Sequence, residues 1–428
     1  MSYPIVRSKH MGRLRKMNRL TGLLFGLLFQ QLTQVRAAEL WLPFPVTSSP
    51  YFGRAVAISG DRAVVGANGA AYVFLRQGDD WLLEQKLSPD DDAVEDPDWS
   101  FTGPSLPPFG ASIAIDGDLI AVAAAYWYSQ PAKIGAVFIF ARKQNGWIKE
   151  SVITSSEPEP FGLAVALEKR TLLVGATENR LENPCGQGTD SGLAYVFVRT
   201  GAGWKQEAKL MSGDTVPIQC EAGEFRSGAS VSLSRDTAVV GASLYLSPVH
   251  GPGSAYIFSR SGQRWVQEGR LDVVPYATPS GITLSLHQES LVIGDSISGQ
   301  VFLYQRDGSA WTQALHYERG APNRTLFGQS VAVRDGALLI SAPRDYIFLG
   351  RYQSPQPGGA LLDFWDPVKG YEGHGAYWHG EFDRELFGWA VALGEGTAII
   401  GAPGGGEAFI FDVPAKTRPS SSPKPTPK

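Results

Sequence analysis

One pattern of strand-like runs recurs along this sequence and limits the folds open to it. Its clearest copy spans residues 52–87, where four short alternating apolar runs are separated by turn residues such as Gly60-Asp61. Period-two runs bounded by Gly and Asp predict antiparallel strands joined by hairpins. One such unit cannot bury a face alone, so we expect it to pack against copies of itself.

The pattern occurs seven times, at roughly fifty to sixty residues per copy. A Phe-Gly pair opens five copies, at Phe52, Phe109, Phe161, Phe327 and Phe387, and degraded versions lie around Gly228 and Gly281. A Val-Gly-Ala run and a Gly-Ala-Tyr-Val-Phe run follow in the same order, with substitutions, in most copies. Seven copies of four strands predict an all-β fold, a seven-bladed β-propeller of four-stranded antiparallel blades.

The N-terminal part of the propeller is expected to close the ring. The seventh copy ends at Phe411 and Val413 without a fourth strand of its own, and the run at residues 39–42 resembles the end of the first copy's fourth strand. We therefore predict that an N-terminal strand completes blade 7, which removes an exposed sheet junction. The alternative is a frayed N-terminus.

The two ends of the sequence differ from the repeats. Residues 1–37 read as a secretory signal, with basic residues before the apolar run 23–29 and small residues near Ala37. About ten apolar residues are too few to cross a bilayer as a helix, which favours cleavage over a retained anchor. Residues 38–413 hold the propeller, and the Pro-, Ser- and Lys-rich residues 414–428 predict a disordered tail. We expect a secreted, periplasmic or cell-surface monomer whose mature chain does not insert into a membrane.

The net charge of the chain argues against polyanionic partners. Without residues 1–38, which hold seven basic and no acidic side chains, the chain has 31 basic and 42 acidic residues, a net charge of −11. Nucleic acids and anionic membranes are bound by clustered Lys and Arg. We therefore expect neither as a partner.

The Phe-Gly, Val-Gly-Ala and Gly-Ala-Tyr-Val-Phe elements resemble the FG-GAP repeat of integrin α-chain propellers and of many secreted bacterial proteins. The resemblance covers nearly the whole mature chain and implies a binding platform, with the Phe-Gly and Gly-Ala-Pro elements structural.

The chain departs from that family in one respect. Many members bind calcium in an Asp-rich loop between the first and second strands of a blade, whereas the seven corresponding connections here are short, such as Gly60-Asp61. Calcium needs six or more oxygen ligands, so we expect no integrin-type calcium site, no other metal site and no cofactor. The acidic segment 90–98 favours a solvated loop over a metal site.

Loop lengths divide the propeller into two faces. Connections between strands 1 and 2 and between strands 3 and 4 are short throughout, whereas the 2–3 and 4–1 connections vary widely, as in residues 88–108 and 177–191. Cys185 and Cys220, the two cysteines of the chain, both map to the variable face, and in an exported protein they are expected to form a disulfide. Two free thiols are the alternative.

The same face carries exposed-loop aromatics suited to recognition. The candidate ligand-binding residues are Trp99, Phe101, Tyr126, Trp127, Tyr128, Tyr245, Tyr346, Tyr352 and Trp378. The alternative for each is that it folds down and packs on the ring. Trp81 and its counterparts in later copies recur at one outer-strand position and are expected to pack.

No catalytic motif stands out, because the six histidines form no metal-binding pair and no nucleophile elbow is present. The sequence therefore predicts a non-enzymatic protein-binding propeller. A carbohydrate-binding propeller that uses the loop aromatics is the alternative, and an enzyme or an accessory domain of one comes third.

Overall fold

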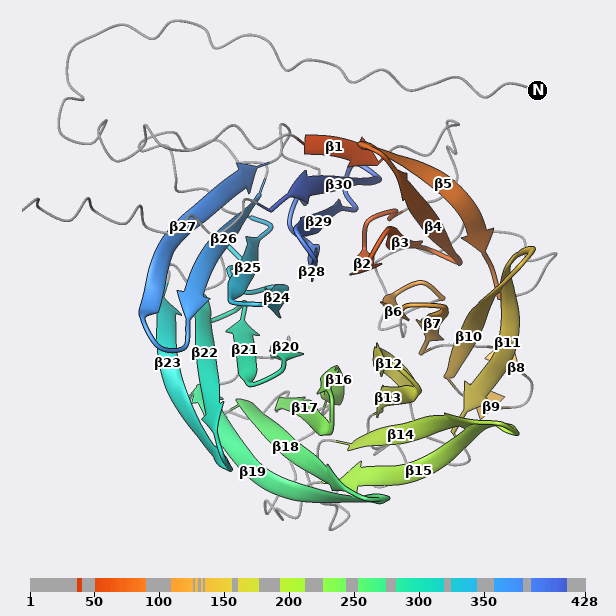
Figure 1. Ribbon diagram of the computed structural model, residues 1–428, viewed down its shortest axis with the longest axis horizontal. Helices are drawn as coiled ribbons and strands as arrows, with labels where there is room; N and C mark the ends of the chain where they lie inside the picture. The colour runs from red at the N-terminus through yellow and green to blue at the C-terminus, as the bar shows by residue number, and fades with distance from the viewer. Residues whose placement is uncertain are drawn as a thin grey trace, which may run out of the picture.

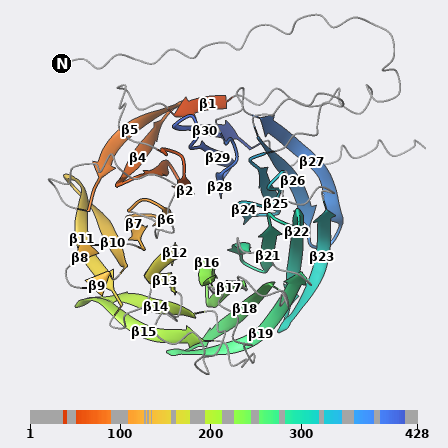
Figure 2. The same ribbon diagram turned by 180° about the vertical axis from the view of Figure 1, so that it is seen from behind.

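A computed structural model describes residues 37–40, 51–89, 109–125, 128–129, 132–133, 135–155, 161–176, 193–211, 226–243, 253–274, 282–318, 325–344, 358–379 and 386–413. These residues form seven four-stranded antiparallel sheets and one two-stranded sheet. The seven sheets stand around a common centre as the blades of a propeller (Figures 1 and 2). The predicted fold class is confirmed.

The strands of each blade are given below from the innermost to the outermost. Blade 1 contains β2 (Ala55–Ser59), β3 (Arg62–Ala67), β4 (Ala70–Gln77) and β5 (Asp80–Leu87); blade 2 contains β6 (Ser112–Asp116), β7 (Leu119–Ala124), β10 (Ala136–Lys143) and β11 (Gly146–Thr154). Blade 3 contains β12 (Phe161–Glu168), β13 (Thr171–Ala176), β14 (Leu193–Thr200) and β15 (Gly203–Met211); blade 4 contains β16 (Arg226–Ser234), β17 (Thr237–Ser243), β18 (Gly253–Ser261) and β19 (Arg264–Val274). Blade 5 contains β20 (Thr283–His287), β21 (Ser290–Asp295), β22 (Gln300–Asp307) and β23 (Ala310–Glu318); blade 6 contains β24 (Val331–Arg334), β25 (Ala337–Ala342), β26 (Gly359–Asp366) and β27 (Gly370–His379). Blade 7 contains β28 (Ala390–Gly394), β29 (Thr397–Ala402), β30 (Glu407–Asp412) and β1 (Ala37–Leu40), and the small sheet pairs β8 (Tyr128–Ser129) with β9 (Ala132–Lys133).

The N-terminal strand closes the ring, as predicted. β1 pairs antiparallel with β30, with Ala37 opposite Phe411 and Leu40 opposite Ala408. Figure 1 shows β1 at the rim, outside β30 and next to β5 of the first blade. The first and last parts of the propeller are thus joined by hydrogen bonds within one sheet.

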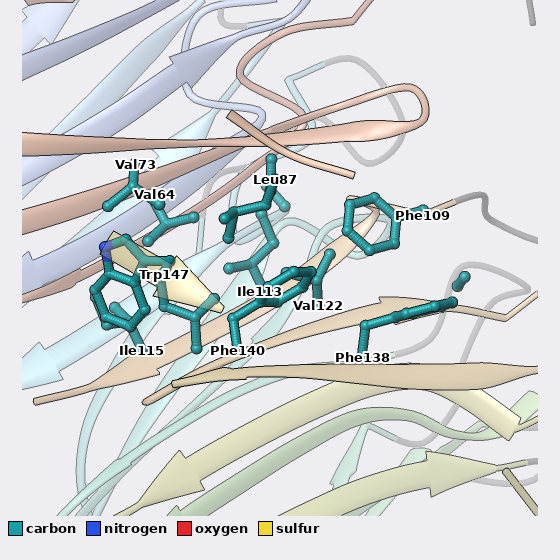
Figure 3. Close-up of a cluster of buried hydrophobic side chains, with 14 of the residues drawn as sticks. Val64, Val73, Leu87, Phe109, Ile113, Ile115, Val122, Phe138, Phe140 and Trp147 are labelled. Carbon is teal, nitrogen blue, oxygen red and sulfur yellow. The ribbon is translucent and has the colours of Figure 1, made fainter. Parts of the chain in front are cut away.

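The apolar core is divided among the blade interfaces. Seven clusters of buried side chains are present in the described residues, one between each pair of neighbouring blades. Figure 3 shows the cluster between blades 1 and 2, where Val64, Val73 and Leu87 of blade 1 face Phe138 and Phe140 of blade 2. Second strands such as β3 are buried along their whole length because both faces of each blade are covered.

The Phe-Gly and Val-Gly-Ala elements of the repeat are two sides of one contact between blades. A Cβ placed on Gly66 would lie 2.1 Å from the carbonyl oxygen of Gly110, in the Phe-Gly turn of the next blade. The same contact joins Gly294 to Gly328 and Gly401 to Gly53, with corresponding distances of 2.4 and 1.9 Å. The last of these joins blade 7 to blade 1. The backbones approach so closely that only glycine fits.

The phenylalanine of the Phe-Gly pair anchors its turn to its own blade. Phe109 is 2% exposed and packs edge-on against Phe138, with ring centroids 5.2 Å apart. Phe52 contacts Tyr72 in the same way at 5.5 Å. The structural role predicted for this element is confirmed.

Candidate functional site

The two faces of the propeller differ as the sequence predicted. On the hairpin face, which carries the 1–2 and 3–4 connections, strand registers such as Ser59 opposite Arg62 and Gln77 opposite Asp80 leave two-residue turns. On the loop face, which carries the 2–3 and 4–1 connections, the intervals range from two residues between β3 and β4 to residues 88–111 between β5 and β6. The loop face therefore holds the length variation, and it is the candidate functional site.

Most of the candidate residues lie outside the described part of the chain. This applies to Trp99, Phe101, Tyr126, Trp127, Tyr245, Tyr346 and Tyr352, to the acidic segment 90–98 and to Cys185 and Cys220. Their roles and the disulfide stay predictions. Tyr128 lies in β8, which pairs with β9, so part of the 2–3 connection of blade 2 forms a small hairpin of its own.

Trp378 is placed in the core, and this corrects its proposed role in ligand binding. The side chain is 8% exposed and belongs to the cluster between blades 6 and 7. Its ring stacks on that of Phe411, with centroids 4.7 Å apart. The residue lies in β27, the outer strand of blade 6, where the sheet register places it opposite Ala360. It packs one blade on the next.

The repeated outer-strand tryptophans also join neighbouring blades, as expected of packing residues. In three of them the indole N–H group donates to a glutamate of the preceding blade: Trp147 Nε1 to Glu84 at 3.1 Å, Trp204 Nε1 to Glu150 at 3.2 Å and Trp265 Nε1 to Glu207 at 2.9 Å. Each glutamate also pairs with an arginine of the same following blade, Arg142, Arg199 or Arg260. The sequence reasoning missed these glutamates, although each lies three residues after a repeated tryptophan of its own blade.

Opposing effects act on the ionisation of Glu84. Burial alone would raise the pKa of its carboxyl group. Hydrogen bonds from Arg62 and Trp147, together with the charges of Arg62 and Arg142, outweigh burial and hold the pKa below its usual value. The carboxylate is therefore charged when it joins the two blades.

A belt of hydrogen bonds runs around the centre of the hairpin face. In blades 1 to 4 the side chain of the last residue in the innermost strand accepts a hydrogen bond from the next blade. The donor is the backbone N–H of the first residue in the turn between the first and second strands of that blade. The pairs are Ser59 with Gly117, Asp116 with Lys169, Glu168 with Arg235 and Ser234 with Gln288. His287 contacts Asp335 at 3.0 Å, and Arg334 donates to Glu395 at 3.2 Å, which extends the belt to blade 7. The polar groups at these positions are used to hold blades together.

The chemistry available in the described residues is limited. No group of three or more His, Cys, Asp or Glu side chains that could hold a metal ion occurs among them. His287 contacts Asp335, while the His316 ring stacks on Phe302 with centroids 4.5 Å apart. Within the part of the chain that the structure describes, no helix is long and apolar enough to span a membrane.

Comparison with protein families agrees with the repeat pattern. The FG-GAP repeat model matches residues 46–74 and 204–258, which lie in blade 1 and in blades 3 and 4. These stretches carry the FG-GAP repeat, and the seven-bladed ring fits a propeller built from it. A propeller with FG-GAP repeats suggests a protein-interaction module in general terms, whereas neither the binding mode nor the partner follows from the repeat. No curated protein matches the sequence significantly.

Solved structures resemble this propeller in fold. The complex of KlAtg21 with the coiled-coil of AgAtg16 matches with a TM-score of 0.53 and 12% identity, covering 85% of this chain and 94% of that one. The WD40 propeller domain of Doa1 matches with a TM-score of 0.49 and 10% identity, covering 88% and 97%. Chaetomium thermophilum Sqt1 matches with 0.47 and 12%, covering 85% and 95%. At these identities the first supports the propeller fold alone.

Proposed function

We propose that this chain is an exported protein-binding propeller that holds its partner on the loop face. The asymmetry of the two faces carries the proposal, because the hairpin-face connections are kept to turns of two or three residues while the loop-face connections differ widely in length from blade to blade. A rigid scaffold with variable loops on one side is how binding sites are commonly built.

The other surfaces of the ring support this choice of face. Polar side chains at the centre of the hairpin face bind the neighbouring blade, as Asp116 does with Lys169. At the rim, Glu84, Glu150 and Glu207 are likewise engaged by the next blade. The polar groups of the repeat are thus used within the ring, and the loop-face insertions fall outside the repeat.

Blade 1 offers a direct test. Its 2–3 connection is the dipeptide Asn68-Gly69, so the same dipeptide can replace residues 125–135 of blade 2 or 177–192 of blade 3 while the strands stay intact. The matched control carries alanine at Lys143 and Gln144, on the hairpin face. Each purified protein is used to capture partners from its native extracellular medium, and the captured proteins are compared quantitatively.

We expect the loop replacements to lose a captured protein that the hairpin-face control retains. Equal capture by all variants would refute the proposal. Capture abolished by enzymatic removal of glycans, with the partner polypeptide intact, would favour the carbohydrate-binding alternative.

A further inference from the structure

Within the described residues, one arginine on the loop face, Arg54, has no carboxylate partner. Arg54 lies directly after the Phe52-Gly53 turn, before β2, and Asn68 lies between β3 and β4. Both positions belong to the loop-face end of blade 1. Arg54 Nη1 donates to Asn68 Oδ1 at 2.5 Å.

The charge of Arg54 is poorly compensated. Within the described residues its guanidinium contacts the neutral Asn68 amide and forms no ion pair, whereas Arg62, Arg260 and Arg306 each pair with a glutamate. Burial lowers the pKa of Arg54 to about 10, and the Tyr51 hydroxyl opposes this only in part. An unpaired, partly buried cation is unfavourable unless an anion reaches it.

The groups around Arg54 present donors. Asn68 is 6% exposed, and its carbonyl oxygen is occupied by Arg54, so its amide nitrogen is left to donate. In the part of the chain that the structure describes, no acceptor takes up that nitrogen. A guanidinium fork beside an amide N–H₂ matches the two oxygens of a carboxylate.

Arg54 is also a departure from the repeat. The residues that follow the other Phe-Gly pairs are Ala111, Leu163, Gln329 and Trp389, none of them charged. A cation at this position is therefore not needed to build the turn. Blade 1 has the shortest 2–3 connection as well, which leaves Asn68 at the tip of its blade.

We propose that Arg54 and Asn68 form a carboxylate-binding site, which on the loop face receives an Asp or Glu side chain or the C-terminal carboxylate of the partner protein. The inference rests on the proposed function for the identity of the partner, and on the residues of blade 1 for the chemistry of the site.

The site can be tested without the partner by thermal unfolding of the full chain. The probes are 100 mM N-acetyl-glutamate amide and the uncharged N-acetyl-glutamine amide, with ionic strength matched by sodium chloride. The unfolding midpoint of the wild type is expected to rise with the first probe and not with the second. Arg54→Gln should abolish the response, while Arg76→Gln, which removes an exposed arginine 3.8 Å from Asp412, should keep it.

Asn68→Asp is the decisive variant, because it places a carboxylate of the protein's own beside Arg54. It is expected to raise the midpoint by about 1–3 °C without any probe and to end the response to the glutamate probe. The proposal would be overturned if the glutamate probe did not raise the unfolding midpoint of the wild type. It would also be overturned if the Asn68→Asp variant folded but had a lowered midpoint, or if the probe raised its midpoint as much as that of the wild type.

Capture experiments separate this inference from the proposed function. If the loop face binds a partner through this site, Arg54→Gln and Asn68→Asp should each weaken binding by about 30-fold or more, and Arg76→Gln should not. Full binding by Arg54→Gln would refute the carboxylate site and leave the loop-face function standing. A probe response without any loop-dependent partner would instead assign the site to a small free carboxylate.

Discussion

Substitution of Gly66 by alanine tests the close contact between blades that defines the repeat. The new Cβ would lie 2.1 Å from Gly110 O and 2.9 Å from Ile113 Cδ1. An ordinary C···O contact is about 1 Å longer, so the Phe-Gly turn of blade 2 must move away. Gly110 lies equally close to blade 1, because a Cβ built on it would lie 2.4 Å from the carbonyl oxygens of Ala67 and Ala70.

The expected cost follows from this geometry. Overpacking a tight core costs typically 1–3 kcal/mol, and a clash with backbone, which cannot turn aside as a side chain can, places Gly66→Ala at about 3 kcal/mol. Unfolding of roughly 375 residues at about 2.1 cal/mol/K each gives an entropy of roughly 0.8 kcal/mol/K. The unfolding midpoint should therefore fall by about 4 °C.

Differential scanning calorimetry provides the measurement, and Gly201→Ala is the matched control. Gly201 has no heavy atom within 4 Å of a built Cβ and no positive φ, so its midpoint should move by about 1 °C or less. If Gly66→Ala unfolds at the same temperature as Gly201→Ala, close glycine contact does not hold the blades together and the reasoning fails.

Three further predictions follow from the same interfaces. Phe109→Ala should cost about 3–5 kcal/mol in urea unfolding because it empties a buried site, whereas Leu82→Ala, at a side chain 48% exposed, should change stability by about 0.5 kcal/mol or less. Because the pKa of Glu84 is lowered in the folded state, its contribution is full above the unfolded pKa of about 4.3. It is lost as pH falls through the folded pKa, so Glu84→Gln should cost about 1 kcal/mol at pH 7 and progressively less as the pH is lowered through that pKa; a cost that does not change with pH would contradict the pairing. Deleting residues 37–40 should expose the edge of β30 and cause self-association, detectable by size-exclusion chromatography as oligomers absent from the undeleted protein.

The fold was predictable because the same strand and turn signals recur in each copy of the repeat. Period-two runs and Gly-Asp turns gave the strands, and the missing fourth strand of the last copy indicated where β1 would pair. The contact between Gly66 and Gly110 was not predictable, since nothing in one copy shows that its Val-Gly-Ala run meets the Phe-Gly turn of the next copy. Spacing within a repeat predicts a blade, whereas contacts between blades depend on how the blades are arranged.

The candidate site was predictable only in part. Loop lengths identified the variable face, because every connection on the other face is a short turn, whereas the 2–3 and 4–1 connections carry the insertions. Trp378 was wrongly predicted to lie in a binding loop. The pairing of β26 with β27 contains two register shifts, and because of this irregularity the sequence pattern did not show that Trp378 belongs to β27. Arg54 was overlooked because it adjoins a structural Phe-Gly pair, and its unpaired charge becomes visible only when its neighbours are known.

The position of Arg54 links binding to the closure of the ring. Gly53, the preceding residue, makes the contact with Gly401 that joins blade 1 to blade 7, and Phe52 packs in the cluster between the same two blades. A carboxylate held by Arg54 would bind the closed ring and not the unfolded chain, so it would stabilise this junction by mass action. Since Arg54 forms no ion pair within the described residues, the free-energy cost of burying its charge would be relieved when a partner's carboxylate is bound. A partner that binds there therefore acts on the one interface where the first and last blades must meet.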